Sequence, residues 1–209
     1  MKSIYIYIAV LFFSFSFSQK KELRQIKRLI DEKFFQEAES LLDSNKDFLL
    51  SGDSKTDSQY YYYATKIYTE TESFVLATSS LEKLMSINTS FYNSEMKLDY
   101  KNLEEILVVA LVNSAVADNS SKKWMQGVDK LLLAYDMNKE TNIDYLYFAA
   151  SGAVNAENFD LALEYYLTLK EKSYTGIIDE YFITNVQSGV EEKVTETEYK
   201  IYQSSKEYI

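Results

Sequence analysis

Apolar residues recur at helical spacing along most of this chain. Leu23, Ile26, Leu29 and Ile30 form a stripe at i, i+3, i+6 and i+7, which is typical of an amphipathic helix over residues 19–33. The chain contains no proline and five glycines, so helices joined by polar loops are favoured over a fold with many sharp turns. The same periodicity predicts further helices over residues 34–50, 55–71, 74–88, 97–117, 122–138, 143–156 and 159–172.

A short motif occurs four times where one predicted helix gives way to the next. In each copy an aromatic residue is followed three positions later by a small one. The four pairs are Phe35 with Ala38, Phe74 with Ala77, Trp124 with Gly127, and Phe159 with Ala162. The aromatic residues lie 39, 50 and 35 positions apart, and repeats of this period are typical of stacked helical pairs. We therefore expect an all-α repeat domain of about four helix pairs over residues 19–172.

The pattern changes after residue 172. Residues 177–185 alternate and are rich in β-branched side chains, residues 186–189 can form a turn, and residues 190–195 can pair back. This arrangement predicts a short β-hairpin. A helix-like stretch over residues 195–208 follows it. We expect residues 173–209 to form a small appendage to the helical domain.

The helical pairs resemble tetratricopeptide repeats, a family of helix–turn–helix units. In that family an aromatic residue opens the second helix, a small residue follows at +3, and apolar or small residues follow at +7 and +10. The matching positions are Phe74, Ala77, Leu81 and Leu84; Trp124, Gly127, Leu131 and Ala134; and Phe159, Ala162, Tyr166 and Leu169. Small residues at Ala64, Ala115 and Ala150 stand where the first helices must approach their partners closely. The resemblance spans roughly residues 20–172 and implies a right-handed solenoid.

The segment from Tyr174 to Glu192 is similar to an insert found in exported repeat proteins of the Bacteroidota cell envelope. In those proteins further repeats usually follow the insert, whereas here only residues 195–209 do. The resemblance implies a protein of the bacterial envelope.

Residues 1–18 have the composition of a secretory signal peptide. Lys2 is followed by an apolar run, and Ser16 and Ser18 occupy the −3 and −1 positions before Gln19. The alternative is a membrane anchor, but the run from Ile4 to Phe17 has 14 residues, against about 20 needed to cross a bilayer. We expect cleavage before Gln19 and export, most simply to the periplasm, with the cell surface or the exterior as alternatives. No membrane span is expected in the mature chain.

Charge and composition exclude several classes of function. The formal net charge is −10, which repels nucleic-acid backbones and anionic lipid, so no nucleic-acid partner is expected. The chain has no histidine and no cysteine, which removes the usual catalytic triads and zinc sites. Acidic pairs such as Glu104-Glu105 and Glu191-Glu192 lack the spacing of a calcium-binding loop. We expect no enzymatic activity, no cofactor and no metal.

The resemblance also implies where a partner binds, because the first helices of tetratricopeptide repeats line the ligand groove. Within the run Tyr60 to Tyr63 we expect Tyr61 to face the core and Tyr62 to face the groove. Carried over by register, the groove positions are Gln59, Tyr62, Lys66, Val112, Val116, Asn119, Asp144, Tyr147, Ser151 and Asn155.

Apolar valines flanked by Tyr62 and Tyr147 suit a peptide or protein partner. The expected function is therefore that of a non-catalytic adaptor or scaffold. An alternative is a carbohydrate- or small-ligand-binding protein that stacks its ligand on the two tyrosines. A groove filled by the chain's own terminal helix or by residues 89–102 is a further alternative.

Overall fold

The computed structural model describes residues 18–87, 94–177 and 180–203, and the side chains of residues 94–101 lie outside the description. Most of the predicted signal peptide and the Ser/Asn-rich segment before residue 94 therefore lie outside the described residues. The chain divides into two compact units, one that ends at Lys172 and one that starts at Ser173.

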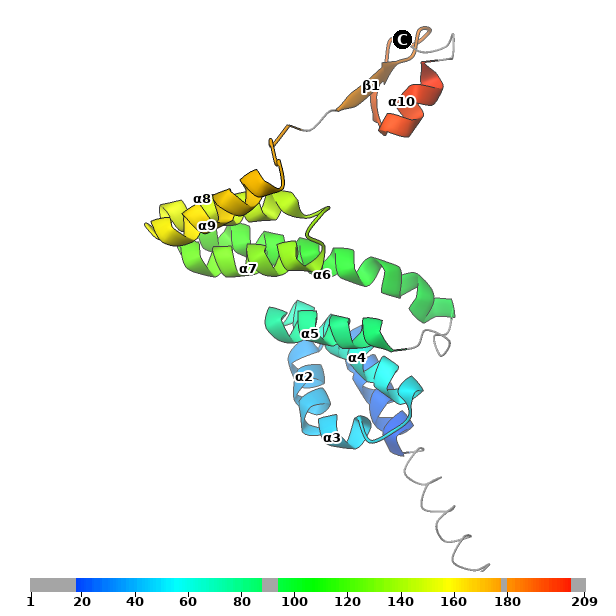
Figure 1. Ribbon diagram of the computed structural model, residues 1–209. Coiled ribbons are helices and arrows are strands. Elements are labelled where there is room, and N and C mark those ends of the chain that lie inside the picture. The colour runs from blue at the N-terminus through cyan, green and yellow to red at the C-terminus, as the bar shows by residue number, and fades with distance from the viewer. Residues whose placement is uncertain (1–17, 88–93, 178–179, 204–209) are drawn as a thin grey trace, which may run out of the picture. The chain divides into compact units, whose positions relative to one another are not determined.

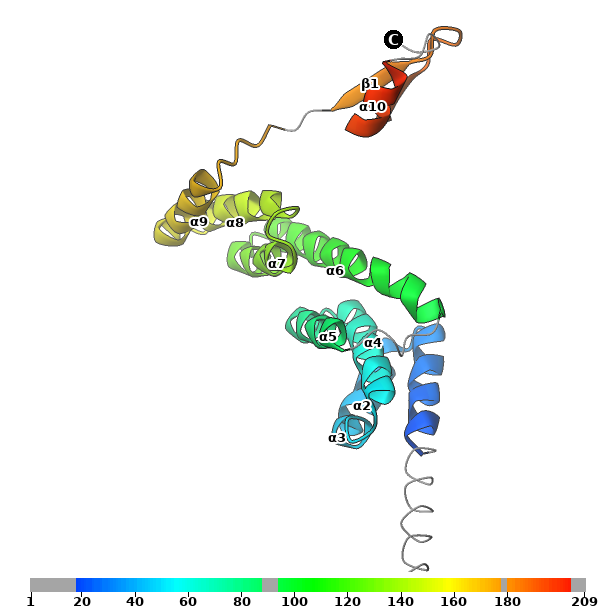
Figure 2. The ribbon, with the colours of Figure 1, turned by 45° about the vertical axis from the view of Figure 1, so that its right-hand side comes forward.

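The first unit is built of helices that pack in adjacent pairs (Figure 1). Its first helix covers residues 18–31. The others are α2 (Phe35–Ser44), α3 (Lys46–Leu49), α4 (Ser54–Glu70), α5 (Phe74–Ser86), α6 (Ser94–Ser120), α7 (Trp124–Met137), α8 (Ile143–Asn155) and α9 (Phe159–Glu171). The predicted helix over 34–50 is interrupted at Asn45, whose side-chain amide donates to the carbonyl oxygen of Leu41 at 2.9 Å. The helix predicted over 97–117 is longer at both ends. It is the helix labelled α6 in Figure 2.

The fourfold motif of the sequence marks a repeated turn. Its aromatic residues are the first residues of α2, α5, α7 and α9. Two positions before each aromatic, Lys33, Glu72, Lys122 and Glu157 adopt left-handed backbone with φ of 62°, 57°, 58° and 59°. At Lys122 the turn is closed by two backbone bonds, Lys123 N to Asp118 O at 2.8 Å and Lys122 N to Asn119 O at 3.0 Å. This is the Schellman arrangement, which ends a helix and reverses the chain.

The small residues of the motif lie inside the unit. Ala38, Ala77, Gly127 and Ala162 are buried, as are Ala64, Ala115 and Ala150 of the facing helices. The predicted register of small residues is thus confirmed. The aromatic residues differ from one another: Phe74 is buried and packs under the Lys130 ammonium, whereas Phe159 is largely exposed.

Polar groups buried beside α4 form a small cluster. The Tyr68 hydroxyl donates to the Asp43 carboxylate of α2, and the Tyr60 and Tyr68 hydroxyls are hydrogen-bonded to each other. Burial, reinforced by the charge of Asp43, raises the pKa of Tyr60 to about 12. Burial together with the bond to Asp43 also raises the pKa of Tyr68. Both phenols are therefore neutral over the physiological pH range.

The second unit holds the predicted hairpin and a short helix. Strand β1 (Tyr181–Thr184) pairs antiparallel with β2 (Glu191–Val194), with Ile183 opposite Glu192. The predicted hairpin is confirmed with shorter strands, and its turn is held by Asn185 Oδ1, which accepts from the backbone N–H groups of Gln187 and Ser188. Helix α10 (Glu196–Tyr202) begins with a Thr195–Glu198 capping box.

Candidate functional site

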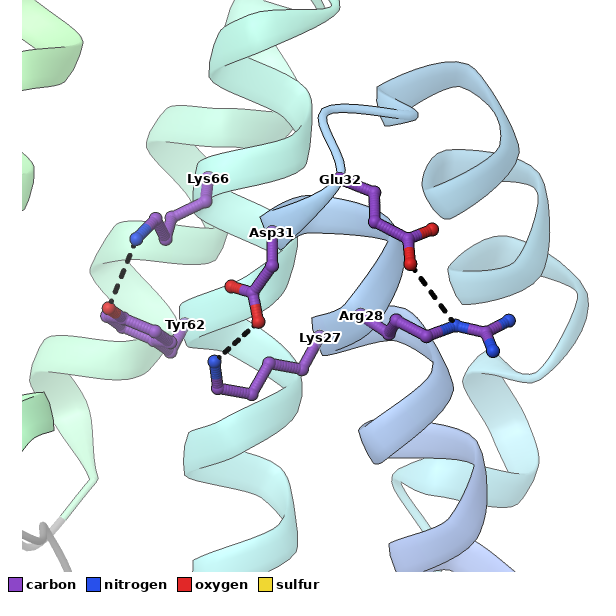
Figure 3. A network of polar contacts seen from close by, with 6 residues as sticks. All are labelled: Lys27, Arg28, Asp31, Glu32, Tyr62 and Lys66. Carbon is purple, nitrogen blue, oxygen red and sulfur yellow. Dashed lines mark hydrogen bonds and ion pairs between the residues drawn. The ribbon is translucent and has the colours of Figure 1, made fainter.

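The predicted groove residues of α4 are only partly accessible. Gln59 and Lys66 are half-buried, but Tyr62 is just 6% exposed and contributes to the core. The ammonium of Lys66 lies 5.2 Å from the ring centroid of Tyr62 and 3.4 Å from its hydroxyl. Figure 3 shows this contact together with two ion pairs of the helix over 18–31, Lys27–Asp31 and Arg28–Glu32.

The expected orientation of Tyr62 was wrong, whereas Tyr61 packs against the core cluster. Tyr60 and Tyr62 are buried, while Tyr61 and Tyr63 are half-buried. A helix turns about 100° per residue, so four consecutive tyrosines point in four directions and composition alone does not select the buried ones. Packing against neighbouring helices buries Tyr62, and Tyr63 takes a place beside Gln59 and Lys66 on the narrow accessible strip of α4.

On α6 the three predicted residues have three different environments. Val116 is 58% exposed. Val112 is half-buried and packs against both apolar clusters of the helical unit. Asn119 faces α7: a Cβ atom at Gly127 would lie 2.3 Å from Asn119 Oδ1. That oxygen is buried and has no hydrogen-bond partner among the described residues, so Asn119 belongs to the helix–helix contact and not to an open groove.

The sequence interpretation missed two exposed apolar residues on α6, Ile106 and Val109. The side of α6 that contacts α7 is marked by Lys130, whose ammonium donates to Ser114 Oγ at 2.7 Å and pairs with Asp118. At 100° per residue, Val109 lies roughly 180° around the helix from Asp118. Ile106, Val109 and Val116 therefore form an apolar stripe on the side of α6 turned away from α7, and we call these three residues the α6 stripe. The sequence did indicate exposed apolar residues on this helix, because residues 106–112 are all apolar and one buried face cannot cover all of them.

The four predicted residues of α8 share one face. Tyr147 and Asn155 are exposed, and Asp144 and Ser151 are half-buried. Their neighbours come from α8 and α9, because the Tyr147 ring lies 5.7 Å from that of Phe148 and 6.3 Å from that of Tyr166. The Ser151 and Tyr166 hydroxyls are 3.3 Å apart. Phe148 and Tyr166 were not predicted as surface residues of this site.

The structure thus groups the ten predicted residues by helix. Helices α4 and α6 are in contact, and the residues of α8 lie against α9. A shallow hollow elsewhere, between the helix over 18–31 and α2, is lined by side chains such as Leu29, Gln36 and Leu41 and contains none of the ten.

The accessible groups of these surfaces are apolar, aromatic, amide and hydroxyl side chains together with the charged Lys66 and Asp144, and they suit binding by contact. Within the described part of the chain, no three acidic, histidine or cysteine side chains are grouped to hold a metal ion. In the same residues no helix is both long and apolar enough to span a bilayer.

Comparison with known proteins found no relative. The chain matches no protein-family model, no curated protein and no solved structure.

Proposed function

We propose that the helical unit is a solenoid of the tetratricopeptide type and that the chain is a non-catalytic, protein-binding scaffold of the bacterial cell envelope. The α6 stripe is the observation that carries this proposal. Val116 is 58% exposed, and Val109 and Ile106 continue the aliphatic surface roughly two and three turns further along α6. The opposite side of α6 contacts α7. Aliphatic stripes of this kind on a helix receive extended peptides or apolar helices.

The turn geometry supports the solenoid. Four helix pairs share a left-handed residue followed two positions later by an aromatic that opens the second helix. A repeated turn gives the two helices of each pair a similar crossing angle. Stacked pairs of similar geometry build a solenoid. The absence of histidine and cysteine from the sequence supports a binding role over acid–base or nucleophilic catalysis. The signal-like residues 1–18 support export.

The proposal is tested by affinity capture with the tagged chain, residues 19–209, from an envelope extract of the source bacterium. Parallel baits carry Val109→Asp with Val116→Asp, or Val75→Asp on α5. Val75 is 69% exposed and lies outside the α6 stripe, so Val75→Asp controls for the addition of a charge to an exposed apolar position and for non-specific loss of binding.

A captured protein should bind the α6 double variant at least about tenfold more weakly, because a desolvated charge in an apolar contact costs more than 1.4 kcal/mol. It should bind Val75→Asp as it binds the unchanged chain. Equal capture by all three baits would show that the α6 stripe is not the binding surface. Thermal unfolding followed by circular dichroism checks that each variant is folded.

A further inference from the structure

Helix α9 has apolar side chains on two sides. Ala162 and Leu169 are buried in the helical unit. On the adjacent side Phe159, Leu163 and Leu167 are 63%, 58% and 49% exposed. Tyr166 borders them where α9 meets α8. The α9 face is the set Phe159, Leu163, Tyr166 and Leu167.

The equivalent face of α7 packs against a neighbouring helix. The sequence repeat places Trp124 and Phe159 35 positions apart, so Val128 corresponds to Leu163 and Leu131 to Tyr166. Val128 and Leu131 are buried in an apolar cluster that includes Ala149 and Ala153 of α8. The approach is close, because a Cβ atom at Gly152 of α8 would lie 2.8 Å from Val128 Cγ2. The α9 face therefore has the same positions along its helix as the α7 residues that pack against α8, but its side chains are exposed.

Charge beside the α9 face restricts the chemistry of its occupant. Asp160, Glu164 and Glu171 are exposed and lie roughly 20–60° around the helix from Leu167. Lys170 is the one basic residue of α9; at 100° per residue it lies among the apolar side chains, between Phe159 and Leu163, and about 80–120° away from the three carboxylates. An occupant that crosses the apolar side chains thus meets a row of three carboxylates along one edge.

We propose that the α9 face binds a basic amphipathic helix of another protein. The helix places its apolar side on Phe159, Leu163 and Leu167, its lysines or arginines beside Asp160 and Glu164, and a glycine or alanine where it crosses Leu163, as Gly152 does at Val128. A second copy of this chain is a poorer occupant, because it would bring the same three carboxylates to the contact. This surface is additional to the α6 stripe and does not depend on it.

The test uses the full mature chain and two synthetic helical peptides of 20 residues. One has a Leu/Ala stripe flanked by lysines, and the other has glutamate at every lysine position. Binding is measured by fluorescence anisotropy at low and at physiological ionic strength. The lysine peptide should bind at least about tenfold more tightly than the glutamate peptide, and added salt should narrow the difference.

Variants locate the contact. Leu163→Ser with Leu167→Ser should weaken the lysine peptide about tenfold, since both side chains are removed from one apolar contact. Asp160→Asn with Glu164→Gln should weaken it several-fold and reduce its salt dependence. Val75→Ser and Val109→Ser, which shorten exposed side chains elsewhere, should leave binding unchanged. All these positions are exposed, so the melting temperature should not move.

Four results would overturn the proposal. They are equal binding of the two peptides, loss of binding in Val109→Ser but not in the Leu163/Leu167 variant, absence of any binding of the lysine peptide, and a concentration-dependent dimer that Leu163→Ser with Leu167→Ser abolishes. The second result would move the helix to the α6 stripe, and the fourth would assign the α9 face to a second copy. Failure of the α6 variants in affinity capture bears on the proposed function alone.

Discussion

Tyr60 is a core residue with a group that titrates at high pH. Its phenol is buried beside the carboxylates of Asp43 and Asp47 and the side chains of Tyr61 and Tyr68. The pKa is raised to about 12, against about 10 for a tyrosine in an unfolded chain. The folded protein thus favours the neutral phenol of Tyr60 over its phenolate, because the phenolate would be buried near carboxylates. Stability contributed by neutral Tyr60 is therefore complete below pH 10 and is lost as the pH rises toward 12.

We predict that the free energy of unfolding falls between pH 10 and pH 12 with a component of about 1.4 kcal/mol per pH unit from Tyr60. Urea unfolding at half-unit steps measures the slope. Tyr60→Phe keeps the ring and removes the titrating group, so it should flatten the slope by about one proton while Tyr68 continues to contribute. An unchanged slope in Tyr60→Phe would show that its phenol ionises normally in the folded protein. Absorbance at 295 nm gives an independent titration of the tyrosines.

The helices of each pair are joined by a repeated turn with a left-handed residue. Lys122 has φ of 58°, a conformation that costs a residue with a Cβ atom about 1–2 kcal/mol and glycine almost nothing. Lys123, its neighbour, has φ of −89° and makes no side-chain cap to α7. The two lysines are both exposed, so a glycine at either removes the same charge and differs only in backbone preference.

We predict that Lys122→Gly raises the free energy of unfolding by up to about 1 kcal/mol, because relief of the left-handed strain exceeds the entropy that glycine adds to the unfolded chain. Lys123→Gly should lower it by about 0.5–1 kcal/mol through the same entropy with no relief. Chemical denaturation of the pair measures both changes. If the two variants shifted stability equally, the turn would not carry strain at Lys122.

The same turns show how far sequence could predict this fold. Trp124 and Phe159 are large aromatics three residues before a small residue; α9 starts at Phe159 as predicted, and α7 starts at Trp124, two residues after the predicted start at 122. The left-handed residues were not predicted, because Lys122 and Glu157 carry none of the glycine signal that usually marks such a position. Helix ends that depend on a single side chain, such as the interruption at Asn45, could not be predicted from the hydrophobic periodicity either.

The candidate site was harder to predict than the fold. Val116 and Tyr147 are exposed as expected. Tyr62 and Asn119 were misplaced because their orientation depends on contacts with other helices. Asn119 is accommodated only because residue 127 is glycine, and the spacing of small residues does not reveal which side chain fills the space that they leave.

The two units of the chain differ in how much apolar surface they bury. The helical unit has two clusters of buried side chains that run through its helix pairs. The unit from Ser173 to Ile209 has 37 residues, and Ile183 is the one core side chain among its described residues. Tyr181 and Tyr199 add a ring contact at 5.1 Å. A segment below about 40 residues rarely buries enough apolar area to be stable by itself.

We predict that hydrogen exchange in the full chain separates the units. Amides of β1 and β2 should exchange at least about 100-fold faster than amides in the centres of α4 and α7, because they open through a local unfolding that leaves the helical core intact. Thr195→Ala, which removes the capping box of α10, should accelerate exchange in the second unit and leave α4 and α7 unchanged. Equal protection of both units, with one response to Thr195→Ala, would mean that the chain unfolds as a single cooperative body. Independent opening would instead leave the helical unit folded whenever the hairpin opens, so the α6 stripe and the α9 face would keep their geometry without it.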